Sequence, residues 1–256
     1  MDIKERIQRL RQKMKERNMD AYIIPSSDPH MSEYTAPRWQ GRKWISGFTG
    51  SAGTVVITGE TGGLWTDGRY YIQAAEQLEG TGIKLFKAGM PDVPDYIEWL
   101  EQTLPTNSRI GLCGEVFPVS RVKEMKKKLS RKKISIVKEF DLIGEIWDDR
   151  PPAPQEPVFI HDVEFAGKTA AEKLKQVRNE MVKKGVNYHL ICSLDDIAWL
   201  YNIRGNDVAY NPVALAYALV SDTCAWLFID KSKVSDAVRS MLEDNGVIIK
   251  DYGLVN

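Results

Sequence analysis

The spacing of apolar side chains predicts an alternation of helices and strands through the first 140 residues. Residues 3–17 carry apolar side chains at every third or fourth position, the spacing of a helix with one buried face. Short apolar and β-branched runs, bounded by Gly, Pro or polar residues, predict strands. The strands are expected at 21–24, 55–57, 64–66, 83–86, 109–112 and 134–137, and further helices from Arg69 to Leu78, at 92–104 and at 119–129. Such alternation is typical of a layered α/β domain.

A glycine-rich stretch from Trp44 to Leu78 contains two motifs that flank a predicted hairpin. Gly47-Phe48-Thr49-Gly50-Ser51-Ala52-Gly53 precedes the strand at 55–57, and Trp65-Thr66-Asp67-Gly68-Arg69-Tyr70 follows from the strand at 64–66. Asp67 is placed to cap a helix that begins near Arg69. The helix dipole does not favour a cation in that first turn. We therefore expect Arg69 either to face solvent or to be paired, with Asp67 as a candidate partner.

A second domain is expected after a proline-rich segment. Residues 149–157 contain four prolines, which favour extended backbone and exclude regular structure. We place the first domain at 1–150, a linker at 151–167 and a second domain at 168–256. The second domain opens with a capping box from Thr169 to Glu172. Its first helix is expected to end at Gly185 and to lead into a buried strand at 188–192.

The second domain repeats the first. Positions match at a constant offset (178 − 11 and 181 − 14 are both 167) and, further on, at a shorter one (199 − 44 and 205 − 50 are both 155). The matched pairs are Arg178 with Arg11, Met181 with Met14, Asp195 with Asp28, Trp199 with Trp44, Gly205 with Gly50 and Trp226 with Trp65. This pattern predicts a tandem duplication.

The repeat predicts that the second domain is incomplete. Its strand at 247–250 matches the strand at 83–86, after which the first domain has two more helices and two more strands. A sheet that stops there is expected to have an unpaired edge and an uncovered apolar face. We infer from this pattern that the chain is a fragment of a longer protein or a truncated reading frame.

Composition limits the binding partners and the cellular compartment that are expected for the chain. Of 256 residues, 35 are Lys or Arg and 35 are Asp or Glu, so no overall field attracts nucleic acid or anionic membrane. The basic run from Lys123 to Lys133 is interpreted as the solvated face of a helix. The chain has no apolar run of bilayer length and no apolar signal core near Met1, which favours a cytoplasmic location. Three scattered cysteines are interpreted as reduced, buried thiols. They are Cys113, Cys192 and Cys224.

The pattern predicts no catalytic and no metal-binding residue in this chain. His30 lies near Asp28 and Glu33 in a long polar loop, and we interpret this group as solvated rather than as a metal site. The chain has no His-Glu-x-x-His helix and no Gly-x-Ser-x-Gly turn. Further polar residues in the second domain are interpreted as helix caps or as residues at an interface with another domain. The expected caps are Asp195 and Asp196, and the expected interface residues are Arg204 and Asp207.

The two motifs, Gly47 to Gly53 and Trp65 to Tyr70, resemble the amino-terminal domain of cytosolic-type aminopeptidase P (Xaa-Pro aminopeptidase), in the creatinase/prolidase superfamily. The resemblance is closest to the three-domain form, because two tandem domains are present. It implies an α/β fold of two tandem creatinase-amino-terminal-like domains, with mixed sheets flanked by helices and the second domain truncated. It also implies that Arg69 reaches an active site in a further domain and contacts substrate, since a planar guanidinium suits a peptide carboxylate or carbonyl. A salt bridge with Asp67 stays open as the other reading of Arg69.

The resemblance implies that the chain is the non-catalytic amino-terminal part of an enzyme that removes the first residue from peptides with proline second. Two divalent metals, expected to be manganese, would activate water in a carboxy-terminal catalytic domain. The expected partners are that domain, a peptide substrate and a second copy in a homodimer, with no nucleic acid and no membrane. The alternative is a stand-alone peptide-binding or scaffold module without enzymatic activity, as in a histone-chaperone subunit.

Overall fold

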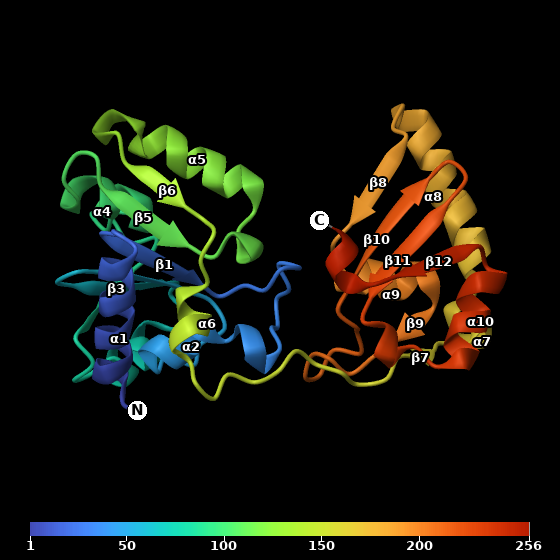
Figure 1. The fold of residues 1–256 in the computed structure, drawn as a ribbon, viewed down its shortest axis with the longest axis horizontal. Helices are drawn as coiled ribbons and strands as arrows, with labels where there is room; N and C mark the ends of the chain where they lie inside the picture. Colours follow the sequence, from blue (N-terminus) through green and yellow to red (C-terminus); the bar gives the residue numbers. More distant parts are fainter. Residues whose placement is uncertain (256) are drawn as a thin grey trace. The chain divides into compact units, whose positions relative to one another are not determined.

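The computed structural model describes residues 1–255, which form two units (Figure 1). The first unit contains residues 1–29 and 37–152, and the second contains residues 30–36 and the chain from Ala153 onward. The chain therefore passes between the units three times. The boundaries 1–150, 151–167 and 168–256 remain our proposal for the domain limits, and the structure adds that residues 30–36 pack with the second unit.

The first unit is built on a six-stranded mixed sheet in the order β4-β3-β2-β1-β5-β6. The strands are β1 (Ala21–Pro25), β2 (Thr54–Thr58), β3 (Gly62–Thr66), β4 (Ile83–Lys87), β5 (Arg109–Leu112) and β6 (Ser135–Val137). One face is covered by α1 (Ile3–Glu16), α2 (Gly41–Ser46), α3 (Tyr71–Gln77) and α6 (Leu142–Ile146), and the other by α4 (Tyr96–Thr103) and α5 (Val119–Leu129). Three short 3-10 turns are η1 (Pro37–Trp39), η2 (Gly114–Val116) and η3 (Ser130–Lys132).

Strand β1 lies inside this sheet and is buried on both faces. It pairs antiparallel with β2 and parallel with β5. Tyr22 and Ile24 point into the core under α1, whereas Ala21 and Ile23 point into the core under α4 and α5. A strand between two cores needs apolar residues at successive positions, which is why this segment is a continuous apolar run.

The longer predicted elements of the first unit are confirmed, and two short ones were missed. Helices α1 and α5 and the β2–β3 hairpin lie where the pattern placed them. Helix α4 begins later than expected because Asp95 is its cap, accepting hydrogen bonds from the backbone N–H groups of Ile97 and Glu98. Helices α2 and α6 span less than two turns each, too short for a helical period to appear in the sequence.

The second unit has a four-stranded sheet in the order β12-β11-β10-β8 and a separate two-stranded pair, β7 with β9. The strands are β7 (Phe159–Ile160), β8 (Tyr188–Ile191), β9 (Ile203–Arg204), β10 (Ala216–Ser221), β11 (Ala225–Ile229) and β12 (Val247–Lys250). The helices are α7 (Val163–Ala166), α8 (Ala170–Lys184), α9 (Leu194–Tyr201) and α10 (Asp236–Asp244), with 3-10 turns η4 (Lys231–Lys233) and η5 (Tyr252–Val255). Helix α8 has the predicted Thr169 capping box and the predicted Gly185 end, with Gly185 at φ 65°.

Equivalent side chains make equivalent contacts in the two units. The guanidinium of Arg6 donates to the carbonyl of Trp44 at 2.5 Å and lies 4.8 Å from the centre of the Trp44 ring. At the offset of 167 stands Lys173, whose ammonium donates to the carbonyl of Trp199 at 2.8 Å and also lies 4.8 Å from the ring. Trp199 is the predicted match of Trp44. The duplication is thus preserved at the level of single hydrogen bonds.

A second repeated contact ties α1 of the first unit and α8 of the second to their sheets. Arg11 Nε donates to the carbonyl of Thr58 at 2.9 Å, and Arg178 Nε donates to the carbonyl of Ser221 at 2.9 Å. This confirms the predicted match of Arg178 with Arg11. Because Thr58 pairs with the first residue of β1 and Ser221 with the first residue of β8, the same contact also fixes the equivalence of the two sheets.

Strand register corrects one predicted match. Trp65 pairs with Thr54 in the first sheet, and Phe228 pairs with the equivalent Tyr217 in the second. Phe228 therefore occupies the place of Trp65, and Trp226 lies two residues earlier on the same face. The sequence match of Trp226 with Trp65 was wrong by two positions because it aligned the tryptophans rather than the strands.

Strand β8 is exposed, so the expectation of a buried strand at 188–192 was wrong. Tyr188 and Leu190 are 65% and 52% exposed, whereas Ala21 and Ile23 at the equivalent positions of β1 are fully buried. The cause is position in the sheet, because β8 is an edge strand and β1 is internal. His189 is accordingly an exposed edge residue and not a core residue.

The core of the second unit lies on one face of its sheet. Helices α8, α9 and α10 pack there against alternate residues of the four strands. Among residues 1–255, no α-helix contributes to a core on the opposite face of this sheet, where η5 contacts β10 and β11. The first unit, by contrast, has a core on each face.

Candidate functional site around Arg69

Arg69 lies in the turn between β3 and α3. Helix α3 begins at Tyr71, and its cap residue Tyr70 makes no side-chain capping bond. The predictions that Asp67 caps this helix and that Arg69 occupies its first turn were therefore wrong. Asp67 instead accepts a hydrogen bond from the backbone N–H of Arg69 at 3.1 Å, a local turn that aspartate forms readily.

The Arg69 guanidinium is paired with Asp67. Arg69 Nε donates to one carboxylate oxygen at 2.9 Å, and Arg69 Nη2 donates to the other at 2.8 Å. The side chains are 66% and 42% exposed, so the pair lies at the surface. The hydrogen bond from Arg69 is the largest cause that lowers the pKa of Asp67, to about 2. Asp67 is therefore a charged partner near neutral pH and is unsuited to act as an acid.

Two further residues complete a group that we call the Arg69 site, namely Ser51, Asp67, Arg69 and Tyr70. The Tyr70 hydroxyl and Ser51 Oγ share a hydrogen bond of 2.7 Å, which is the main cause that lowers the pKa of Tyr70. The Arg69 guanidinium lies 5.1 Å from the centre of the Tyr70 ring, within range of a cation–π contact. The hydrogen bond between Ser51 and Tyr70 thus holds the glycine-rich loop beside Arg69.

Small residues are required in that loop. A Cβ atom added at Gly50 would lie 2.3 Å from the Phe48 ring and 2.8 Å from the Tyr70 ring. The prediction that residues 50–53 form a tight turn rather than a nucleophile elbow agrees with this packing, since Ser51 is held by a tyrosine hydroxyl.

Arg42 holds the glycine-rich loop through hydrogen bonds, a role that sequence analysis did not predict. Its guanidinium donates to Ser26 Oγ at 2.7 Å, to the Phe48 carbonyl at 2.7 Å and to the Gly50 carbonyl. Arg42 is only 6% exposed, and burial lowers its pKa to about 10, so the side chain stays charged. The residue was missed because α2, in which it lies, spans less than two turns, so no periodic pattern separates a buried arginine from a solvated one.

A groove of about 330 Å³ lies beside Asp67 in the first unit. Its wall is formed by the ends of β2 and β3 and by the start of α4, and it carries both apolar and charged side chains. The charged residues that line it are Asp67, Asp95 and Arg121. Arg121 already donates to the Tyr96 hydroxyl at 2.9 Å and to Glu124 at 2.6 Å.

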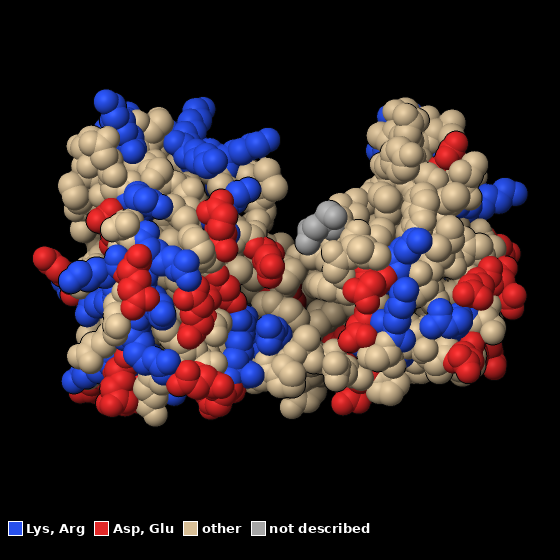
Figure 2. Space-filling model, in the orientation of Figure 1, with Lys and Arg blue, Asp and Glu red and all other residues tan. Residues whose placement is uncertain are grey.

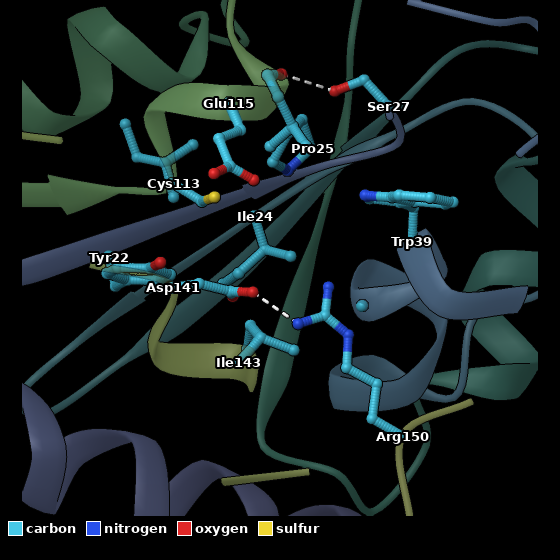
Figure 3. A pocket seen from close by; sticks show the side chains of 13 residues that line it. Tyr22, Ile24, Pro25, Ser27, Trp39, Cys113, Glu115, Asp141, Ile143 and Arg150 are labelled. Carbon is cyan, nitrogen blue, oxygen red and sulfur yellow. Dashed lines mark hydrogen bonds and ion pairs between the residues drawn. The ribbon is translucent and has the colours of Figure 1, made fainter. Parts of the chain in front are cut away.

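A second cavity in the first unit is too small for a ligand. It has a volume of about 40 Å³, room for one or two waters, and its lining includes Arg150 and Asp141, which form an ion pair of 2.5 Å (Figure 3). Cys113 lines it, and burial raises the pKa of that thiol to about 11, so it is not a nucleophile near neutral pH. All three cysteines are free thiols, as expected, but the prediction that they are buried was wrong, since Cys192 is exposed and Cys113 and Cys224 are only partly buried.

The structure gives His30, one of the polar-loop residues weighed as a metal site, partners in the second unit. His30 belongs to the second unit, where its Nδ1 lies 3.1 Å from the Cys192 carbonyl and its Nε2 lies 2.9 Å from the Tyr252 hydroxyl. Its ring also packs against Tyr217, with centroids 4.4 Å apart. Among residues 1–255, no three His, Cys, Asp or Glu side chains are grouped so as to hold a metal ion.

Arg204 and Asp207 have contacts within the second unit, with Arg204 donating to the Ala198 carbonyl at 2.8 Å, and their role at an interface with another domain stays a prediction. Ser193, and not Asp195 or Asp196, caps α9, so the predicted caps were wrong and the two carboxylates lie in its first turn. Asp207 is buried and forms an ion pair with Lys233 that is also buried, and it accepts from the Leu215 backbone N–H at 2.6 Å.

The basic run lies on the exposed side of α5 and η3, as expected (Figure 2). Lys128 is partly covered because it pairs with Asp95 at 2.9 Å. Within the described part of the chain, no helix has both the length and the apolar character that crossing a bilayer requires.

The fold and this site define a tandem pair of α/β domains in which a surface arginine, pre-oriented by a carboxylate, stands at the end of a strand. Residues 6–143 and residues 149–256 each match the creatinase/prolidase N-terminal domain. The chain belongs to the creatinase/prolidase N-terminal domain family, and the predicted class of two tandem domains with mixed, helix-flanked sheets is confirmed.

Longer proteins of this family resemble the chain over nearly all of its length. Aminopeptidase P2 of Arabidopsis thaliana is 42% identical across 91% of the chain, and a probable Xaa-Pro aminopeptidase P of Neurospora crassa is 41% identical across 97%. The crystal structure of an X-prolyl aminopeptidase from Caenorhabditis elegans, described as a cytosolic enzyme with a di-nuclear active site, superposes with a TM-score of 0.95 and 36% identity over 99% of the chain. The chain spans 33%, 36% and 43% of the lengths of these three proteins.

Proposed function

We propose that this chain is the non-catalytic amino-terminal part of a metal-dependent Xaa-Pro aminopeptidase. The supporting observation is the extent of the similarity, which covers almost the whole chain but only about a third of the plant relative. The enzyme hydrolyses the bond after the first residue of peptides that have proline second. Two divalent metals, for which we propose manganese, act in a catalytic domain outside residues 1–256, and the protein works in the cytoplasm as a homodimer.

The role proposed for the Arg69 site is to contact the peptide substrate. Asp67 fixes the plane of the guanidinium by a two-point ion pair, and Tyr70 supports it from one side. A guanidinium has five N–H donors in a fixed plane, so one already bound to a carboxylate can also hold a peptide carbonyl or carboxylate. Arg42 and the glycine-rich loop keep this arrangement in place through Ser51 and Tyr70.

The function is tested by comparing the complete polypeptide with residues 1–256 in a hydrolysis assay. With Mn²⁺ and a peptide of sequence Xaa-Pro-Xaa, we expect the complete polypeptide to release the first residue and residues 1–256 to release none. Hydrolysis by residues 1–256 alone would contradict the proposal. Absence of hydrolysis by the complete, metal-loaded polypeptide would favour the scaffold module instead.

The role of Arg69 is tested in the complete polypeptide with Arg69→Lys. Lysine keeps the charge but loses the planar two-point geometry, so we expect KM for a tripeptide to rise at least about tenfold, the loss of a charge-assisted hydrogen bond. Arg131→Lys is the matched control, because Arg131 is also a surface arginine paired with one acid, Glu101. Equal KM values for the two variants would remove Arg69 from the substrate site.

A further inference from the structure

The groove beside Asp67 is continuous with the Arg69 site, because Asp67 belongs to both. Its volume of about 330 Å³ is in the range of pockets that bind small ligands in proteins. All the residues that line it belong to the first unit. A peptide held at Arg69 therefore has a hollow next to it into which its following residues can extend.

Aromatic and apolar side chains form a fixed wall of this groove. Trp65 is stacked on Phe86, with ring centroids 4.1 Å apart, and Trp65 Nε1 donates to the Pro94 carbonyl at 2.9 Å. The ring of Tyr96 lies edge-on to Trp65 at 6.3 Å, and Val93 also lines the groove. Grooves lined by aromatic side chains bind extended, proline-containing peptides in other proteins, because such peptides lose little conformational entropy on binding.

Both carboxylates that line the groove already have cationic partners. Asp67 is bound by Arg69. Asp95 accepts from Lys128 Nζ at 2.9 Å with one oxygen and caps α4 with the other. A cationic ligand would have to displace these partners, so the lining favours a neutral or an anionic group.

Arg121, at the start of α5, repeats the arrangement of Arg69. Its guanidinium lies 5.0 Å from the centre of the Tyr96 ring, and the Arg69 guanidinium lies 5.1 Å from the ring that follows it in the chain. Glu124 forms an ion pair of 2.6 Å with Arg121, just as Arg69 has one acidic partner. An arginine held in this way presents its other N–H donors in a fixed plane, which suits a carboxylate.

We propose that the groove binds the residues of a peptide substrate that follow those held at Arg69, and that Arg121 binds a carboxylate on this part of the peptide. The inference rests on the proposed function, which places the peptide at Arg69. The carboxylate belongs either to the carboxy terminus of a short peptide or to an acidic side chain. Specificity then includes a preference for peptides longer than three residues that carry a negative charge beyond the proline.

Hydrolysis of two hexapeptides by the complete polypeptide tests the inference. Both have alanine first, proline second and glycine at every later position, and one ends in a free carboxylate whereas the other ends in an amide. We expect Arg121→Gln to raise KM for the free acid about tenfold, the effect of losing one charge-assisted hydrogen bond. KM for the amide and for a tripeptide should not change. Arg121→Lys should restore part of the loss, because it keeps the charge without the planar fork.

Arg131→Gln is the matched control. Arg131 is a surface arginine paired with Glu101, and it does not line the groove. We expect this variant to have the KM values of the unsubstituted protein for all three peptides. An equal rise in KM for the free acid and the amide in Arg121→Gln would show a structural effect and overturn the proposal, as would the absence of any rise.

A third hexapeptide identifies the source of the carboxylate. It ends in an amide and has glutamate at its last position. If Arg121→Gln raises KM for this peptide about tenfold, an acidic side chain can supply the carboxylate. If only the free acid responds to the substitution, Arg121 binds the carboxy terminus.

Failure of this inference is distinguishable from failure of the proposed function. Hydrolysis of every peptide with KM values that do not depend on Arg121 would support the aminopeptidase and overturn the role of the groove. If no peptide is hydrolysed, NMR of the Arg121 side chain in residues 1–256 decides. A shift of its Nε–H resonance with the free-acid hexapeptide, but not with the amide, would support a peptide site in the groove, and no shift with either would overturn it.

Discussion

At the scale of single residues, the chain uses its arginines and lysines in two different ways. Arg69 is a surface guanidinium held by one carboxylate, whereas Arg42 is buried and held by two backbone carbonyls and a hydroxyl. An exposed ion pair contributes little to stability, so the main effect of the Asp67–Arg69 pair is to orient the guanidinium. Removing a buried guanidinium leaves several acceptors unpaired, so the main effect of Arg42 is to stabilise the fold. The two residues therefore call for different tests.

The Asp67–Arg69 pair predicts a specific titration. The pKa of Asp67 is lowered to about 2 from its ordinary 3.8, so the folded state favours the ionised carboxylate. Any stability from the pair is present above about pH 4 and is lost as the pH falls toward 2. In Arg69→Gln, measured by NMR of the Asp67 side chain, the pKa should return to about 4. An unchanged pKa in Arg69→Gln, or an equal rise in Arg131→Gln, would show that Arg69 is not its cause.

Loss of Arg42 is expected to destabilise the first unit. Methionine fills a similar volume but leaves the Phe48 and Gly50 carbonyls without their donor, so Arg42→Met should cost about 2–4 kcal/mol of unfolding free energy in urea. Arg109→Met is the comparison, because the Arg109 side chain is exposed and should change stability by less than about 0.5 kcal/mol. Similar midpoints for the two variants would refute the structural role of Arg42.

At the scale of elements, what the sequence revealed depended on length and on regular burial. Helices α1 and α8 and the β2–β3 hairpin could be placed because a full period of apolar positions was present. Helices α2 and α6 could not, because each is shorter than two turns. β8 shows a different limit, since apolar composition indicates a strand but does not tell an internal strand from an edge. At the Arg69 site, the ion pair with Asp67 was one of two alternatives that the sequence left open, whereas Ser51, Tyr70 and Arg42 meet only through the fold.

The buried ion pair between η4 and the loop after β9 gives a prediction at this scale. Lys233→Met removes the only charged partner that the structure gives Asp207 among the described residues, and a buried carboxylate without a partner typically costs about 3–5 kcal/mol. The double variant with Asp207→Asn should recover part of that loss, since no charge then stays buried. Equilibrium unfolding in urea measures both. Full additivity of the two single losses would show that the residues do not stabilise each other.

At the scale of the whole molecule, residues 1–256 contain a duplicated scaffold and, in the part that the structure describes, no side-chain cluster suited to a metal. We expect Mn²⁺ to raise the melting temperature of the complete polypeptide by mass action and to leave that of residues 1–256 unchanged. Differential scanning fluorimetry with and without Mn²⁺ makes this comparison, and Ca²⁺ serves as a control for nonspecific ion effects. A rise in the melting temperature of residues 1–256 with Mn²⁺ would contradict this expectation and make Asp28, His30 and Glu33 the candidate metal ligands.

The chain crosses between the two units three times, and this limits how such proteins can be recombined into chimeras. Residues 30–36 are encoded in the first half of the gene but pack with the second unit, where His30 contacts Tyr217 and Tyr252. A chimera that joins the first half of one homologue to the second half of another at the proline-rich segment would place a foreign histidine loop against native tyrosines. Functional exchange of modules within this family therefore requires two coordinated grafts, although the sequence suggests a single joint.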